Sequence, residues 1–480
     1  MATNSLKARS VVEPGSFGAV NFVAAALGDK RRTERLILVA DQIASHPEGS
    51  LPQKLGDPAS YEGMYRLCKR PEVTHAAVLE PHRQSTLEKM RACEQTVLVI
   101  HDTTELDYTS RTKLHDQIGQ IGDGGGRGYE CHNSLAVVAA TGEVLGLANQ
   151  ILHHRADVSK TEGVAAKRRR EDRESLMWLR GSQAVGSPPA GRQWVDVCDR
   201  GADTFEFLDD EDRRDRSYLI RSNHNRAIIT GHGDGYGEKP RVLLHDFMRL
   251  AEAIGGRAVF VPGGRGRKSR WAKCLLSVVA VRILPPHVKR GQHRREPLCV
   301  WAVRVWETDA PADVAEPLEW LLLTNVPTTN LDEAVTRIQW YESRWIVEDF
   351  HKCQKTGCGI EKLQFDHADR LEPMIALLSV VAVMLLNLRD AARKGEAAAA
   401  PAVMYTPVVQ VAVLSVWRYR ERRVDLTIHE FVMALARLGG HQNRKSDGTP
   451  GWITLWRGWI KLQQMVDYAI KAGVERCDEY

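Results

Sequence analysis

The stretch Thr96-Val-Leu-Val-Ile-His-Asp102 is a run of β-branched and apolar residues that ends in an aspartate. Its length and composition are typical of a buried strand. Two later stretches, Trp194-Val-Asp-Val-Cys-Asp199 and Tyr218-Leu-Ile-Arg-Ser222, have the same character, and a hairpin pattern and a charged helical pattern precede them. This order of elements predicts a mixed α/β fold built on one sheet.

The residues before the first strand have helical patterns. Asp29 is placed to cap a helix that begins at Lys30, and further helices are expected over residues 61–69 and 75–93. We therefore expect an N-terminal helical domain over residues 1–70.

The residues after the third strand differ in composition from those before it. Between about residues 223 and 317, glycine and proline are frequent, short strand-like runs recur, and basic residues cluster in the turns. This pattern predicts an antiparallel β subdomain inserted into the sheet, which Trp320-Leu-Leu-Leu-Thr324 then resumes. We expect a core domain over residues 71–375 and a C-terminal helical domain over residues 376–480.

Composition excludes several classes of protein. The chain has 480 residues, of which 43% are hydrophobic and 26% charged, so it is neither disordered nor fibrous. The N-terminus lacks the apolar core of a signal peptide, and the longest apolar stretch, residues 374–388, is too short to span a bilayer. Nine cysteines without a CxxC pair favour reduced thiols, and we expect a cytoplasmic protein with no membrane partner.

The net charge of +5 is small, so the distribution of charge carries more information than the total. Four basic clusters are candidates for contact with nucleic acid or for solvated helix faces. They are Lys30–Arg35, Lys167–Arg170, Arg265–Arg270 and Lys289–Arg295.

The stretch Tyr341-Glu-Ser-Arg-Trp-Ile-Val-Glu-Asp-Phe-His-Lys-Cys-Gln-Lys355 carries the most chemical information. On a helix that turns about 100° per residue, five polar residues of this stretch share a stripe roughly 60° wide. They are Tyr341, Arg344, Glu348, Lys352 and Lys355. One carboxylate among three cations and a phenol suits an enzyme that acts on a nucleic-acid backbone, with the acid binding a metal and the cations binding phosphate.

Asp102 and Asp199 each follow a predicted strand, and the carboxyl ends of neighbouring strands are where α/β folds build sites. If the helix of Glu348 packs across that sheet, the three acids converge. Three carboxylates that hold two magnesium ions can support in-line attack at phosphorus, and manganese is the alternative ion for such hard oxygen ligands.

Other interpretations of these acids remain open. Glu348 and its basic neighbours can form an ordinary ion-pair ladder on a helix surface, and the two aspartates can simply open turns. Four further acids are rival candidates for the two strand positions. They are Glu105, Asp107, Asp196 and Asp203.

Tyr341, Arg344, Glu348 and Lys355 match the Y-(2)-R-(3)-E-(6)-K signature of the insertion-sequence-four family of DDE cut-and-paste transposases, the family of the Tn-five transposase. The chain resembles this family from about residue 20 to residue 390, because four other blocks match in order. They are residues 25–33, 101–108, 197–203 and 318–324. One departure is Gly201, where relatives often carry an acid.

The resemblance implies an RNase H-like core with an antiparallel insertion, an N-terminal helical domain that binds the transposon end, and a C-terminal helical domain that dimerises. It implies that Asp102, Asp199 and Glu348 are the catalytic metal ligands for two Mg²⁺ ions, for which Mn²⁺ substitutes. Phosphate-binding roles then fall to Tyr341, Arg344, Lys355 and Arg221, and the stripe adds Lys352. Trp320 matches an aromatic residue that stacks on a flipped base, and the N-terminal DNA contacts are assigned to Arg31, Arg32 and Arg35.

The activity implied is that of a bacterial, nucleoid-associated transposase. A homodimer binds the inverted-repeat ends in double-stranded DNA, nicks one strand, forms and reopens a hairpin, and joins the 3′ end to target DNA. Two other classes compete with this hypothesis. One is a non-catalytic DNA-binding regulator of transposition, and the other is an RNA-binding module around Gly263–Arg270.

Overall fold

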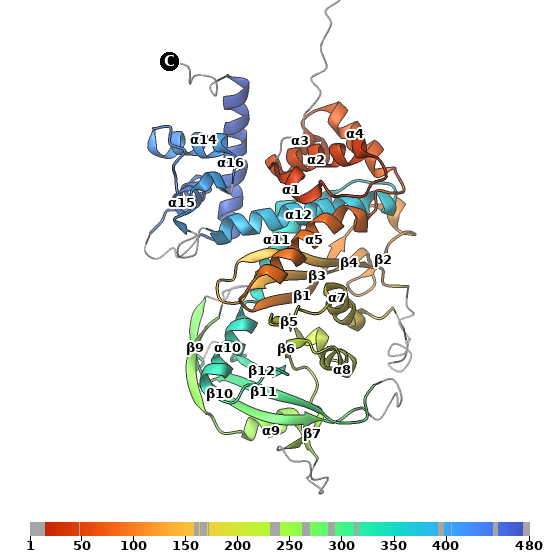
Figure 1. Cartoon of the computed structure of the whole chain (residues 1–480), viewed down its shortest axis with the longest axis vertical. Coiled ribbons are helices and arrows are strands. Elements are labelled where there is room, and N and C mark those ends of the chain that lie inside the picture. Colours follow the sequence, from red (N-terminus) through yellow and green to blue (C-terminus); the bar gives the residue numbers. More distant parts are fainter. Residues whose placement is uncertain are drawn as a thin grey trace, which may run out of the picture.

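The computed structural model describes residues 15–473 apart from 48, 158–162, 164–169, 171, 231–240, 262–268, 287–292, 312–313, 315, 392–397, 405 and 445–449. A mixed sheet of twelve strands forms the centre, and helices flank it (Figure 1). The strand order is β2-β3-β1-β5-β6-β12-β11-β10-β7-β8, with β4 on β3 and β9 on β10. The predicted α/β class with one sheet is confirmed.

The first part of the sheet contains both parallel and antiparallel pairs. Its strands are β1 Val97–Asp107, β2 Gly119–Ile121, β3 Gly126–Val138, β4 Val144–His153, β5 Trp194–Cys198 and β6 Ser217–Arg221. β5 pairs in parallel with β1 and with β6, and β3 pairs antiparallel with β1. The prediction that the first strand ends at Asp102 is wrong, because β1 continues through Asp107 on its partner β3.

The second part of the sheet is antiparallel. It comprises β7 Ala227–Thr230, β8 Val242–Leu243, β9 Gly255–Val261, β10 Arg270–Ile283, β11 Leu298–Glu307 and β12 Glu319–Thr324, with helix α9 Leu244–Leu250. β12 pairs with β6 on one side and with β11 on the other. The antiparallel strands therefore extend the first sheet rather than form a sheet of their own.

Helices occupy the two ends of the chain. The N-terminal helices are α1 Phe17–Phe22, α2 Lys30–Ser45, α3 Leu51–Leu55, α4 Pro58–Cys68 and α5 His75–Ala92. Asp29 caps α2 as predicted, since its Oδ1 accepts the Arg31 N–H at 2.9 Å. The later helices are α7 Met177–Val185, α8 Phe205–Arg213, α10 Leu331–Glu342, α11 Trp345–Lys352, α12 Ala368–Ala391, α14 Val408–Tyr419, α15 Ile428–Leu438 and α16 Trp452–Lys471.

The apolar stretch 374–388 lies in α12, which is a buried helix as predicted. It runs between the sheet and the terminal helices and contacts α5, β4, α15 and α16 (Figure 1). None of the helices in the described part of the chain is long and apolar enough to cross a bilayer. The expected domain boundary at residue 375 falls inside this helix.

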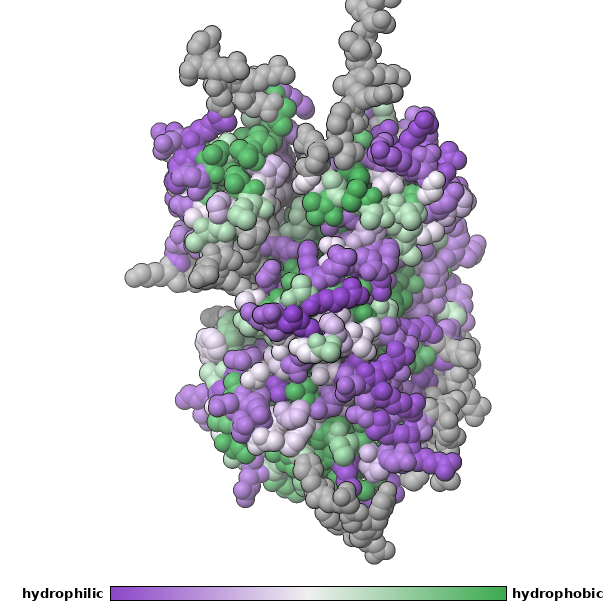
Figure 2. All heavy atoms as spheres, in the orientation of Figure 1, coloured by the Kyte–Doolittle hydropathy of each residue, from purple (hydrophilic) through white to green (hydrophobic). Residues whose placement is uncertain are grey.

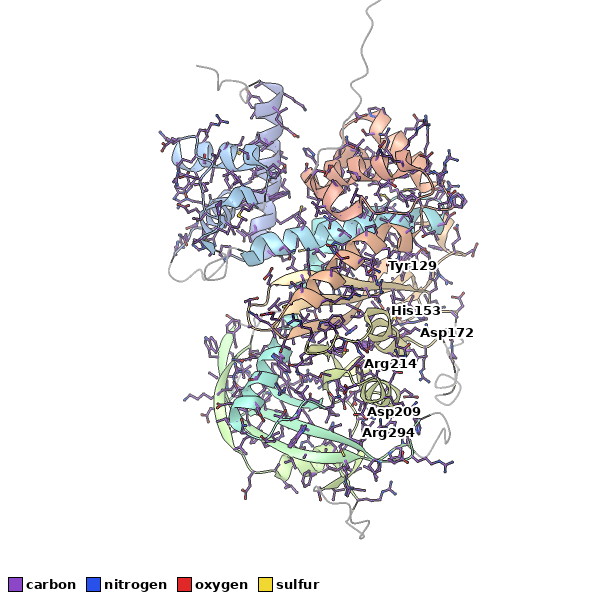
Figure 3. The ribbon with its side chains drawn as sticks, in the orientation of Figure 1. Tyr129, His153, Asp172, Asp209, Arg214 and Arg294 are labelled. Atoms are coloured by element: carbon purple, nitrogen blue, oxygen red, sulfur yellow. The ribbon has the colours of Figure 1, made fainter. Side chains whose placement is uncertain are left out.

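The core and the antiparallel strands are also joined by ion pairs. Arg294, from the segment before β11, donates its Nε–H to Asp209 of α8 at 2.6 Å (Figure 3). Arg294 belongs to the basic cluster 289–295, so at least this member of the cluster has a structural partner. Residues 167–169, 265–268 and 289–292 of the basic clusters lie outside the described residues.

Candidate active site

The parallel pairing of β1 with β5 sets the relation between Asp102 and Asp199. The last paired residues are His101 and Cys198, and the two aspartates are the next residue on each chain. They therefore stand side by side where the parallel pairing ends. Asp199 has left β5 and accepts the Gly201 N–H at 2.9 Å, which orders the turn Arg200–Ala202.

The surroundings of Gly201 leave no room for a side chain. A Cβ atom at this position would lie 2.3 Å from the indole ring of Trp178, a residue of α7 that is 8% exposed. No side chain fits there while the indole stays in place. The turn that carries Asp199 is thus packed directly against α7.

We predict that Gly201→Ala lowers the free energy of unfolding by about 1–3 kcal/mol, because the added methyl group overpacks a buried contact. Denaturant unfolding monitored by tryptophan fluorescence measures the change. Gly451→Ala is the matched control, since a Cβ there meets nothing within 4 Å. Equal stability of the two variants would show that the Trp178 contact is loose.

The four rival acids have other partners in the structure. Asp196 is fully buried. It accepts a hydrogen bond from His101 Nε2 at 2.7 Å and forms an ion pair with Arg216. Asp203 accepts the backbone N–H groups of Asn223 and His224 at 2.5 and 2.8 Å.

Glu105 and Asp107 also bind backbone N–H groups, those of Gly122 at 2.7 Å and Thr109 at 2.8 Å. All four rivals therefore serve as local structural acceptors.

Glu348 of α11 lies next to Asp102. Val347 and Phe350 on the opposite side of this helix are fully buried, and α11 contacts β1. Ligand atoms of Asp102, Glu348 and His351 all lie within 4.8 Å of one another. Asp199 is outside this set of three.

The single helix expected over residues 341–355 is wrong. The chain breaks its helix after Glu342, starts α11 at Trp345 and passes into a π-helical turn, Cys353–Gly357. Arg344 therefore lies at the junction between two helices rather than on a continuous stripe. Tyr341 is separated from Glu348 by this break.

His351 was missed by the sequence reasoning, although a signal was present. It follows Glu348 by three residues on a helix, a spacing that places two side chains on one face. Burial lowers the pKa of His351 to about 3, so its imidazole is neutral at neutral pH.

Arg344 lies between two of the acids. Its guanidinium donates to Asp102 at 3.0 Å and to Glu348 at 3.4 Å, and its side chain is 12% exposed. Burial raises the pKa of Asp102 to about 7; Arg344 opposes this shift, and the nearby Asp199 and Glu348 carboxylates add to it. Burial likewise raises the pKa of Asp199. Carboxylates that repel one another in this way are stabilised by a cation among them.

A cavity of about 340 Å³ opens in front of Asp102 and Glu348. Its lining includes Asp102 and Glu348 and the two lysines of the predicted stripe, Lys352 and Lys355. Lys352 is 3.1 Å from Asp349, and Lys355 is 3.3 Å from Glu361. These pairs are partly exposed, so they are weak and leave the ammonium groups free to turn towards a phosphate.

Tyr341, Arg221 and Trp320 form a second group beside Arg344. The Tyr341 hydroxyl lies near the Arg221 guanidinium, and the Tyr341 ring lies edge-on to Trp320 with centroids 5.2 Å apart. Burial raises the pKa of Tyr341, and the guanidinium groups of Arg344 and Arg221 oppose the shift. Trp320 is 7% exposed, so a base can stack on it only after a neighbour moves.

The three N-terminal arginines differ in exposure. Arg31 is exposed at the start of α2, whereas Arg32 pairs with Glu72 at 2.8 Å. Arg35 lies beside Gly63 of α4. Of the three, Arg31 is the most accessible to a ligand.

Residues 15–73, which contain α1–α4 and these arginines, match a protein-family model described as transposase DNA-binding. The match supports a transposase that binds DNA through its N-terminal helices.

Proposed function

We propose that this chain is a DDE cut-and-paste transposase of the insertion-sequence-four type. The observation that carries the proposal is that Asp102 and Asp199 lie side by side where the parallel pairing of β1 with β5 ends, with Glu348 of α11 next to Asp102. The transposase DNA-binding match supports the same assignment from an independent part of the chain. The core is then an RNase H-like domain, with the antiparallel strands as its insertion.

The acids suit hard divalent cations. Their oxygen atoms are the ligands that magnesium and manganese prefer. In this structure the positively charged guanidinium of Arg344 lies next to Asp102. Asp102, Asp199 and Glu348 would hold two Mg²⁺ ions or their Mn²⁺ substitutes. Bound there, the ions would activate water or a 3′-hydroxyl and stabilise the leaving oxygen.

The cations around the cavity are assigned to phosphate. Lys352 and Lys355 line the cavity and would hold the backbone of the cleaved strand, while Arg344 would exchange its contact with Asp102 for a phosphate oxygen. Tyr341 and Arg221 would bind a neighbouring phosphate. Trp320 would receive a flipped base once its contact with Tyr341 opens.

The reaction course would use one site for several in-line phosphoryl transfers in succession. The proposed steps are nicking, hairpin formation, hairpin opening and joining to target DNA. No covalent protein intermediate is needed, because each step exchanges one oxygen for another at phosphorus.

The terminal helices would bind the DNA ends and the second subunit. Arg31, Arg32 and Arg35 would contact the transposon end. Residues 376–480 would form the dimer, which agrees with the apolar side chains that gather over the C-terminal helices in Figure 2. Val408 and Val416 of α14 are 51% and 50% exposed, and Tyr468 of α16 is 75% exposed.

The proposal is tested by incubating the purified chain with Mg²⁺ or Mn²⁺ and duplex DNA taken from both sides of its reading frame. We expect cleavage at short inverted repeats that flank the frame. A gel shift without cleavage under either metal would contradict the enzyme and favour the non-catalytic regulator. Competition by RNA stronger than by duplex DNA would favour the RNA-binding module.

A further inference from the structure

A series of hydrogen-bonded polar side chains leads from the cavity to helix α12. It begins at His351 and continues through Asn133 of β3 and Gln150 of β4 to Ser379 of α12. Gln150 also contacts His75 at the start of α5. The links measure 3.2 Å, 2.7 Å, 2.9 Å and 2.9 Å in this order, and all of these side chains except that of His75 are buried.

The direction of these hydrogen bonds follows from one hydroxyl. Ser379 donates its proton to the Ile375 carbonyl at 2.7 Å, and a carbonyl can only accept. Towards Gln150 and Gln354 the Ser379 oxygen must therefore accept, from their amide nitrogens at 2.9 Å each. This fixes the orientation of the Gln150 amide.

The orientation of the Gln150 amide in turn determines that of the Asn133 amide. The Gln150 nitrogen also faces Asn133, so Asn133 Oδ1 accepts from it and Asn133 Nδ2 faces His351. The Cys131 thiol, 3.7 Å from Asn133 Oδ1, contributes a donor on the same side. Asn133 Nδ2 carries only donors, so His351 Nε2 must be the acceptor and the imidazole must be neutral.

A neutral imidazole whose Nε2 accepts carries its proton on Nδ1. His351 lines the cavity, and among the described residues no hydrogen-bond partner is found for Nδ1. We propose that His351 presents its Nδ1–H to the substrate as a hydrogen-bond donor for a non-bridging phosphate oxygen, and that Asn133 is the positioning residue that fixes this tautomer. The inference rests on the proposed function for the identity of the substrate.

With this tautomer, His351 is not a metal ligand, unlike the acids that lie beside it. A metal bound through Nε2 would displace the Asn133 amide, and a metal bound through Nδ1 would require a proton on Nε2, directed at the Asn133 N–H groups. Both arrangements leave buried donors unpaired. The cation site would then consist of carboxylate oxygens alone, and His351 would contact the phosphate instead.

The tautomer can be measured without any enzymatic activity. The method is two-bond ¹H–¹⁵N correlation spectroscopy of protein with ¹⁵N-labelled histidine. The His351 signals are identified as those that disappear in the His351→Asn variant. We expect the pattern of a neutral Nδ1–H ring. Asn133→Asp replaces the donor by an acceptor of equal shape and is expected to convert the ring to one protonated at Nε2. A wild-type ring protonated at Nε2 would overturn the proposal.

The role is tested with two replacements of His351. Asparagine keeps an amide N–H near the position of Nδ1, whereas glutamine places its amide near Nε2. We expect His351→Gln to slow Mg²⁺-dependent cleavage of the flanking duplex by about 100-fold, and His351→Asn by about tenfold or less. Equal losses in both variants would contradict a donor at Nδ1.

Calorimetric titration with Mn²⁺ alone completes the test. Both variants are expected to bind Mn²⁺ within about twofold of the wild type, since the carboxylates are unchanged, whereas loss of a ligand costs at least about tenfold. A tenfold weaker affinity in both would make His351 a metal ligand and overturn the inference. If the wild type binds Mn²⁺ but cuts no DNA, the proposed function fails, and the nitrogen shifts still decide the tautomer.

Discussion

Asp102→Asn is expected to reduce DNA cleavage by at least about a thousandfold while DNA binding is retained. The substitution removes one charged ligand from the proposed metal site, and a loss of about 4 kcal/mol of transition-state stabilisation corresponds to this factor. It keeps the volume of the side chain and its contact with the Thr103 N–H, which is 3.0 Å from Oδ1. The fold and the N-terminal helices should therefore be unaffected.

Cleavage of the flanking duplex and a gel shift on the same DNA measure the two properties separately. Asp107→Asn is the matched control, because Asp107 lies on the same strand and is exposed. We expect the control to cut within about twofold of the wild type, as surface substitutions have small effects. Equal loss in both variants would argue against a specific role for Asp102.

Arg216→Met is expected to lower the free energy of unfolding by about 3–5 kcal/mol, the cost of breaking a buried ion pair on one side. Arg216 is 1% exposed and contacts Asp196 of β5 and Glu211 of α8, which are both fully buried. Burial and the nearby Asp196 raise the pKa of Glu211, and loss of the guanidinium removes the positive charge that opposes this shift. Asp196 also holds His101, the neighbour of Asp102, so the network links stability to the geometry of the site.

Denaturant unfolding of the variant measures this change. Arg214→Met is the control, since Arg214 is 45% exposed and pairs with Asp210 at the end of α8 (Figure 3). Exposed pairs contribute about 1 kcal/mol or less. A stability of Arg216→Met equal to that of the control would mean that the buried acids are neutralised in another way.

Much of the fold follows from local patterns in the sequence. The run of β-branched residues up to His101 forms a strand, and Asp29 begins a helix, because neighbouring residues decide both outcomes. The end of β1 could not be predicted from local patterns. It depends on β3, whose residues from His132 back to Gly128 pair with β1 beyond Asp102. The break between α10 and α11 at Ser343 and Arg344 contains no glycine or proline, so the sequence gives no local signal for it.

The candidate site was predictable only in part for the same reason. Strand ends and helical spacing indicated Asp102, Asp199 and Glu348, but not that Arg344 would lie between two of these acids. His351 could be found only from its spacing to Glu348, and its hydrogen-bond partner Asn133 is distant in sequence. The sequence showed that Gly201 departs from the transposase pattern that the chain resembles. The reason, the close approach of the Trp178 indole, is found only in the structure.

In the proposed site Asp102, Asp199 and Glu348 would hold the cations together. Replacing Asp199 is the sharpest test, because this residue lies outside the tight group of ligand atoms around Glu348. The measurement is a calorimetric titration of Mn²⁺ into the wild type and Asp199→Asn. We predict an affinity at least about tenfold weaker in the variant, with the fold intact. An unchanged affinity and stoichiometry would contradict a site shared by the three acids.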